Sequence, residues 1–203
     1  MKKYFAALTT TALISAAPFA LATSSTDLTV TGLITPVACT PTFSGGGDID
    51  LGKISSGDLK QDQNTLVGSH PLTLTVNCNA AATFSINPID NNPGTTIGDW
   101  FGLGLTDDGK KLGFFYPKIL RANADGAAAD PIESNDSGTT WVKADSAQPG
   151  YWLSVANTGD TDPIEAQVVT MDFEVETYIA RADGLDLTND VNINGSATFE
   201  IVY

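Results

Sequence analysis

The stretch VVTMDFEVETYIA, residues 168–180, alternates apolar and polar side chains along most of its length. Its apolar positions share one parity: Val169, Met171, Phe173, Val175 and Ile179. Its acidic positions share the other parity: Asp172, Glu174 and Glu176. Successive side chains of a β-strand point to opposite faces of the sheet. The period of two therefore predicts a long strand with one dry face and one acidic, wet face.

Outward from this strand, the chain repeats the same texture in shorter runs. Helical periodicity is nearly absent, and clusters of Gly, Pro, Asn, Asp and Ser separate the alternating stretches, which is typical of an all-β sandwich. The expected strands are residues 28–37, 49–54, 72–77, 82–86, 111–116, 140–142, 151–155, 168–180 and 193–203. Residues 122–138 are small and polar without a period, and they predict a long surface loop that is functional, disordered or contains a short helix.

Two further alternating stretches lie at the C-terminus and near residue 30, and each predicts a strand. The C-terminal stretch SATFEIVY, residues 196–203, places four side chains on one face: Ala197, Phe199, Ile201 and Tyr203. The early stretch LTVTGLIT, residues 28–35, does the same with Leu28, Val30, Gly32 and Ile34. Such strands must pair with something, because an open apolar edge invites aggregation. Alternation alone leaves open whether the partner strand belongs to the same molecule.

The first 22 residues, MKKYFAALTTTALISAAPFALA, have the order of a secretory signal peptide. Two lysines precede an apolar run, and small residues precede the expected cleavage after Ala22. A membrane anchor is the alternative, but Thr9, Thr10, Thr11 and Ser15 interrupt the run, which is shorter than the roughly 20 residues that span a bilayer. We therefore expect an exported, soluble chain of about 181 residues, the size of one domain.

Charge and cysteine content narrow the function further. The chain has 24 acidic and 10 basic residues, a formal charge of -14, and loss of the two leader lysines makes it -16. Nucleic acid is not expected as a partner, because phosphate binding needs clustered Lys and Arg. Cys39 and Cys78 in an exported chain predict one disulfide. The lone His70 has no second histidine to complete a metal site and reads as a surface residue flanking a strand.

Five segments together resemble the subunits of chaperone-usher pili. LTVTGLITPVAC, residues 28–39, places Gly32 seven residues before Cys39, as in the alternating N-terminal extension of that family. Similar to later family segments are DIDLGKISSGDL (48–59), LTLTVNCN (72–79), FEVETYIA (173–180) and ATFEIVY (197–203). The resemblance is poor over residues 89–162. The Ala-Cys-Thr-Pro start and the acidic, Gly-rich composition look most like a less characterised fimbrial group known only as a domain of unknown function.

The resemblance implies an immunoglobulin-like sandwich that lacks its final strand, with a leader at 1–22, a donor-strand extension at 23–35 and a pilin domain at 36–203. In the periplasm of a Gram-negative bacterium, a chaperone would lend a strand to the open groove. At the outer-membrane usher, the extension of the next subunit would replace it, building a cell-surface fimbrium for adhesion. No cofactor, metal or catalytic residue is implied.

Roles follow residue by residue from the same resemblance. Leu28, Val30, Gly32 and Ile34 would form the donor face. Ala197, Phe199, Ile201 and Tyr203 would line the groove wall and pair with the chaperone, and the Cys39–Cys78 disulfide would join the first strand to its neighbour. Two departures are visible: Tyr203 is last, where the family aromatic is usually penultimate, and residues 23–27 carry no apolar anchor.

Other classes of protein compete with this one. An enzyme is not expected, since His70 is the only histidine and no GxSxG is present. A secreted calcium- or carbohydrate-binding β-sandwich is the stronger alternative. The oxygens for calcium would come from DNNPGTTIGD (90–99), NTGDTD (157–162) and DGLDLTND (183–190), although the same residues are turn formers. A tip adhesin is a different alternative within the pilus system, and the short mature chain and the donor-like strand before Cys39 argue against it. Its sugar-stacking face would come from Trp100, Phe101, Trp141, Tyr151 and Trp152, whose other interpretation is core and rim.

Overall fold

A computed structural model describes residue 26, residues 28–32 and residues 37–203. The chain divides into two compact units, Met1–Ile34 and Thr35–Tyr203. The expected signal peptide and both expected domain boundaries, after residues 22 and 35, lie outside the described residues. None of the helical segments in the described part has the length and apolar character needed to cross a membrane.

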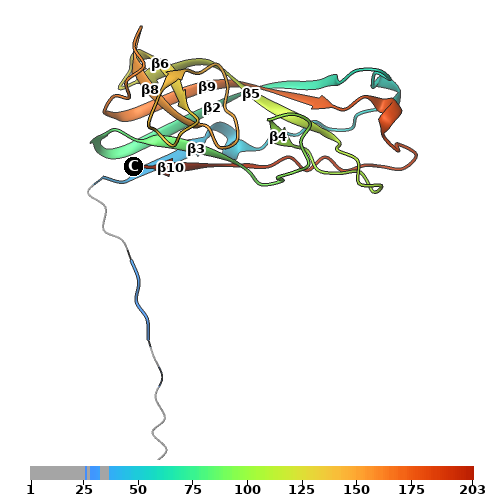
Figure 1. Ribbon diagram of the computed structural model, residues 1–203, viewed down its shortest axis with the longest axis horizontal. Coiled ribbons are helices and arrows are strands. Elements are labelled where there is room, and N and C mark those ends of the chain that lie inside the picture. The colour runs from blue at the N-terminus through green and yellow to red at the C-terminus, as the bar shows by residue number, and fades with distance from the viewer. Residues whose placement is uncertain (1–25, 27, 33–36) are drawn as a thin grey trace, which may run out of the picture. The chain divides into compact units, whose positions relative to one another are not determined.

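The larger unit is all-β, as the alternating pattern predicts (Figure 1). Its strands are β1 (Cys39–Phe43), β2 (Thr65–Ala82), β3 (Ser85–Asp90), β4 (Phe101–Gly102), β5 (Gly113–Ala124), β6 (Ala127–Ser134), β7 (Val142–Lys143), β8 (Trp152–Asn157), β9 (Ala166–Ile179) and β10 (Ala197–Val202). Three short 3-10 helices complete the described elements: η1 (Ser44–Gly47), η2 (Ser56–Asp58) and η3 (Ala182–Gly184).

Strand β9 lies between the two other long strands of the sheet, β2 and β5, and the prediction for residues 168–180 is confirmed. It pairs antiparallel with β2 on one side and β5 on the other, so that Phe173 lies opposite both Leu72 and Ile119. Its apolar side chains from Val169 to Val175 are buried in the core together with Leu74 and Val76, and Ile179 is buried in a second apolar cluster. On the other face, the Thr73 hydroxyl donates to Asp172 at 2.6 Å and the Ser69 hydroxyl donates to Glu174 at 2.6 Å.

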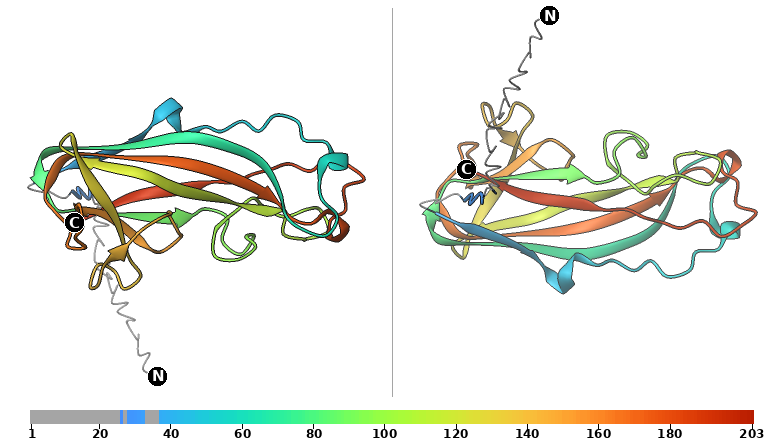
Figure 2. Two further views of the ribbon diagram at one scale, coloured as in Figure 1. Left: turned by 90° about the horizontal axis from the view of Figure 1, so that it is seen from above. Right: turned by 90° about the horizontal axis from the view of Figure 1, so that it is seen from below.

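The strands form one continuous sheet in the order β1-β2-β9-β5-β6-β8-β3-β10, with β4 on β5 and β7 on β6. The sheet curls around the core so that its two end strands approach each other, and the rings of Phe43 on β1 and Phe199 on β10 lie 5.0 Å apart. In the view from below, β10 (red) and residues 44–59 (blue to cyan) border the same face of the unit (Figure 2, right). In the described part of the chain, no strand pairs β1 with β10.

Residues 122–138 are not a loop, and that prediction is wrong. They form most of the β5–β6 hairpin, in which Ala122 pairs with Ala129 and Ala124 with Ala127. The two turn residues, Asp125 and Gly126, have φ of 48° and 81°, the conformation of a type I′ turn that favours Asp-Gly. The Asp125 carboxylate also accepts the backbone N–H groups of Gln167 and Val168, at 3.0 and 2.8 Å.

Several other predicted strands shift or disappear. Residues 49–54 and 193–196 are not strands, and neither are residues 28–32, the described part of the first predicted strand. Residues 72–77 lie inside the much longer β2, and residues 151–155 overlap β8. His70 does not flank a strand at the surface: it lies within β2, is half-buried and packs beside Gly68.

An apolar groove between two free strand edges

The free edge of β10 is set by its pairing with β3. The Ser196 carbonyl accepts the N–H of Asn91, and Thr198 and Glu200 lie opposite Ile89 and Asn87. Because backbone groups alternate sides along an antiparallel strand, the N–H and C=O groups of Ala197, Phe199 and Ile201 point away from β3. Among the described residues, β10 has no other strand partner.

The free edge of β1 faces the same gap. The Ala38 carbonyl accepts the N–H of Asn79, so alternation turns the backbone groups of Cys39, Pro41 and Phe43 away from β2. Pro41 has no N–H to leave unpaired on this side, which suits an edge strand. Cys39 lies opposite Cys78, and the predicted disulfide between them is confirmed, with the two Cα atoms 3.9 Å apart.

A groove of about 870 Å³ opens beyond Phe43 and Phe199, alongside the segments that adjoin the two edges. One wall is the segment that follows β1, residues 47–59, and the other is the segment that leads into β10, residues 187–199. The floor is apolar and comes from the long strands, with Leu72, Phe115, Phe173 and Val175. Phe199 stands at the floor, with its ring 6.2 Å from that of Phe173.

The rim of this groove is polar and mostly acidic. Asp48 and Asp50 stand on one wall and Asp190 stands on the other, with Lys53 as the basic residue of the rim. Neither wall is a strand over residues 48–55 or 187–196. The backbone there makes isolated contacts only, such as Gly52 N–H donating to the Asp50 carboxylate at 2.8 Å and Asn194 N–H donating to the Leu103 carbonyl at 3.0 Å.

The four residues predicted to line the groove wall are not equivalent. Ala197 and Phe199 line the groove. Ile201 packs against the main core instead. Residue Tyr203 is 62% exposed, and its hydroxyl accepts the backbone N–H of Cys39 at 2.6 Å.

The predicted donor residues lie in the smaller unit, Met1–Ile34. Leu28 and Val30 are 90% and 86% exposed, and an added Cβ at Gly32 would meet nothing within 4 Å. Ile34 lies outside the described residues. The described part of the extension thus presents apolar side chains that the chain itself does not bury.

Sequence reasoning missed most of the groove. Leu103 and Phe115 belong to the floor. Neither was singled out, because Leu103 follows the two-residue strand β4 and Phe115 lies in β5, which was only partly predicted. The second wall carried a usable signal. Leu187, Val191 and Ile193 continue the odd-numbered apolar parity of the terminal strand upstream, and all three line the groove.

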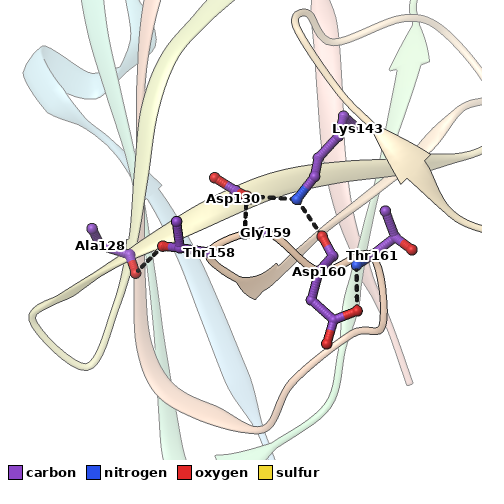
Figure 3. A network of polar contacts seen from close by, with 7 residues as sticks. All are labelled: Ala128, Asp130, Lys143, Thr158, Gly159, Asp160 and Thr161. Carbon is purple, nitrogen blue, oxygen red and sulfur yellow. Dashed lines mark hydrogen bonds and ion pairs between the residues drawn. The ribbon is translucent and has the colours of Figure 1, made fainter.

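The acidic turn sequences are held together by their own hydrogen bonds. In NTGDTD, the Lys143 ammonium donates to the Asp130 carboxylate at 2.5 Å and to the Asp160 carbonyl, while Gly159 N–H donates to Asp130 at 2.7 Å (Figure 3). The hydrogen bond from Lys143, followed by that from Gly159, lowers the pKa of Asp130. The part of the chain that the structure describes holds no group of three or more acidic, His or Cys residues arranged for a metal ion.

The other two turn sequences behave in the same way. Asp90 accepts the N–H groups of Asn92 and Gly102, at 2.9 and 3.2 Å. Asp183 forms an ion pair with Arg181 at 2.5 Å. These contacts are those of turn residues that close local loops.

The aromatic residues considered for sugar stacking are divided between core and rim. Phe101 is 0% exposed and stacks on Phe115 with ring centroids 4.9 Å apart, so it offers no surface to a sugar. Trp141 and Trp152 both pack against Gly138, and the indole N–H of Trp141 donates to the Gly138 carbonyl at 3.1 Å. The ring of Trp100 meets that of Tyr116 edge-on at 4.4 Å.

The sequence is similar to one family model and to two curated proteins. Residues 28–100 match the family model described as "Protein of unknown function (DUF1120)". The chain is similar to Protein GltF of Escherichia coli (strain K12), with 27% identity over 97% of each chain. It is also similar to the uncharacterized protein YhcF of the same strain, with 24% identity over 88% of this chain and 90% of the relative.

Proposed function

We propose that the chain is a structural subunit of a bacterial surface fimbria that polymerises by donor-strand exchange. In this account a periplasmic chaperone captures the subunit, an outer-membrane usher receives it, and neighbouring subunits complete one another's sheets in a fibre that contributes to adhesion. The proposal rests on the resemblance to pilus subunits, and one structural observation supports it most: a groove with an apolar floor lies between the segments that continue from β1 and lead into β10, two strands whose outer edges are unpaired in the described chain.

The chemistry of the groove suits an extended peptide with alternating apolar side chains. Backbone groups of Ala197, Phe199 and Ile201 on one side, and of β1 on the other, offer ladder hydrogen bonds to an inserted strand. The apolar floor offers burial worth about 25 cal/mol per Å². A few Val, Leu or Ile side chains would therefore contribute several kcal/mol before the cost of association.

The exposed extension supplies side chains of that kind. Leu28 and Val30 alternate with Thr29 and Thr31, so a strand formed here would present its apolar face to a groove and its threonines to solvent. The calcium- or carbohydrate-binding alternative has less support, because Asp90, Asp160 and Asp183 of the three candidate turn sequences already bond locally.

The test removes the proposed donor strand. A variant that lacks residues 23–32 should be captured by the chaperone, since its groove is intact, and should fail to extend a fibre when it is the only subunit expressed. Electron microscopy of the cell surface and recovery of the chaperone complex measure the two steps. A control with Thr29→Ser and Thr31→Ser keeps the apolar face and should assemble. Normal fibres from the deletion variant alone would contradict the proposal.

A further inference from the structure

The two free edges touch at one end of the gap. There, the Tyr203 hydroxyl accepts the backbone N–H of Cys39 at 2.6 Å. Cys39 N–H belongs to the row of β1 groups that alternation directs at the gap. The bond therefore joins the last residue of the chain to the edge of the first strand across the space that a completing strand would fill.

A second contact reinforces the first. Phe43, also on β1, meets Phe199 on β10 edge-on, with ring centroids 5.0 Å apart. Beyond these contacts the walls separate, and residues 47–59 and 187–197 border the open groove. The gap is thus closed by side chains at the disulfide end and open at the other.

We propose that the Tyr203 hydroxyl is a latch that holds the disulfide end of the groove closed in the free subunit and slows strand insertion. The inference rests on the proposed function. An inserted strand that pairs with β1 needs the Cys39 N–H as a ladder donor, and that donor is already engaged. Insertion therefore requires that the Tyr203–Cys39 bond break.

The exposure of Tyr203 makes such a latch reversible. The residue is 62% exposed, so a released hydroxyl can hydrogen-bond to water. The net contribution of an ordinary hydrogen bond of this kind corresponds to about a fivefold change in an equilibrium constant. A latch of that size delays insertion without preventing it.

The test compares the exported chain, residues 23–203, with its Tyr203→Phe variant. A fluorescent peptide with the sequence of residues 23–36 serves as the donor strand, and its uptake is followed by anisotropy. The variant keeps the ring and loses only the hydroxyl, so we expect uptake about fivefold faster or tighter. Tyr178→Phe is the matched control: it removes a hydroxyl that donates to Glu176 at 2.6 Å on the outer face of β9, and it should leave uptake unchanged.

Amide hydrogen exchange gives a second readout. If Tyr203 only stabilised the fold, its replacement would change exchange throughout the sheet and not at Cys39 alone. Exchange at Cys39 should accelerate in Tyr203→Phe while exchange in the core of β9 stays unchanged. Equal uptake by both proteins, or slower uptake by the variant, would overturn the latch and leave the proposed function standing. No uptake by either protein would overturn both.

Discussion

Phe199 contacts both the opposite strand β1 and the floor of the groove. Its ring contacts Phe43 across the gap and Phe173 on the floor, at centroid distances of 5.0 and 6.2 Å. The same residue leaves its backbone groups on the free side of β10. It therefore serves the core and the groove together.

Replacing Phe199 with aspartate should impair both roles. A carboxylate among these rings loses the aromatic packing and buries a charge, and we expect a loss of about 2 kcal/mol of stability together with weaker chaperone capture. Periplasmic abundance and recovery of the chaperone complex measure the effect. Thr198→Asp, which adds the same charge to the exposed face of β10, should be nearly neutral. Equal losses in the two variants would contradict the role given to Phe199.

Asp136 organises the turn after β6. Its carboxylate accepts the Ser134 and Thr140 hydroxyls, at 2.7 Å each, and the N–H groups of Thr139 and Thr140. The hydrogen bond from Ser134, followed by those from Thr140, lowers the pKa of Asp136 from 3.8 to about 2. Because the folded state depresses this pKa, the ionised carboxylate stabilises the fold above pH 3.8, and the stabilisation disappears as the pH falls to about 2.

The pH dependence of an Asp136→Asn variant tests this assignment. At pH 7 the variant should melt at a lower temperature than the natural chain, because the amide nitrogen is a poor substitute for a carboxylate oxygen. The difference should shrink between pH 3.8 and about 2, where the natural carboxylate also becomes protonated. Thermal unfolding at several pH values provides the measurement, and a difference independent of pH would count against it.

At the scale of elements, the pairing of β5 with β9 depends on the absence of a side chain at Gly113. An added Cβ there would lie 2.1 Å from the Tyr178 carbonyl oxygen and 3.1 Å from the Ile179 Cα, both backbone atoms. Gly113→Ala should destabilise the chain by about 1–3 kcal/mol, in the range of overpacked sites. Denaturant unfolding measures the loss. Gly184→Ala, where an added Cβ meets nothing within 4 Å, is the control, and equal stability of the two variants would refute the role of Gly113.

Elements were predictable where one face is buried and one is wet. Strand β9 was readable because every buried side chain from Val169 to Val175 alternates with a polar one. The β5–β6 hairpin was missed because the buried positions beside its turn, Ala122, Ala124 and Ala129, are alanines, which blur the contrast between faces. Its turn, Asp125–Gly126, did carry a local signal, since Asp-Gly favours a type I′ turn.

The groove was less predictable than the strands that flank it. Residues 49–54 alternate like a strand and are not one, because a strand exists only when another strand pairs with it. Conversely, the Tyr203–Cys39 bond joins residues 164 positions apart, and no local pattern predicts it. The alternation of Ala197, Phe199 and Ile201 indicated which face of β10 is apolar, but only the strand order shows that its outer edge is free.

At the scale of the whole molecule, the sheet does not close by pairing β1 with β10. It ends in the two edges of these strands that remain unpaired within the described residues. Exposed edges and apolar grooves promote aggregation. The free chain should therefore tend to aggregate in solution unless another strand pairs with these edges. The formal charge of -14 opposes this tendency through repulsion between copies. In the free chain, the Tyr203–Cys39 and Phe43–Phe199 contacts cover one end of the gap between β1 and β10.

The most direct measurement is amide hydrogen exchange along β10, before and after addition of a peptide with the sequence of residues 23–36. The free chain should exchange rapidly at Ala197, Phe199 and Ile201, whose N–H groups face the gap, and slowly at Thr198 and Glu200, which pair with β3. Peptide should protect the first set and leave the second unchanged. A stable monomer in which both sets of amide groups are already protected, and whose exchange does not change when the peptide is added, would contradict the account.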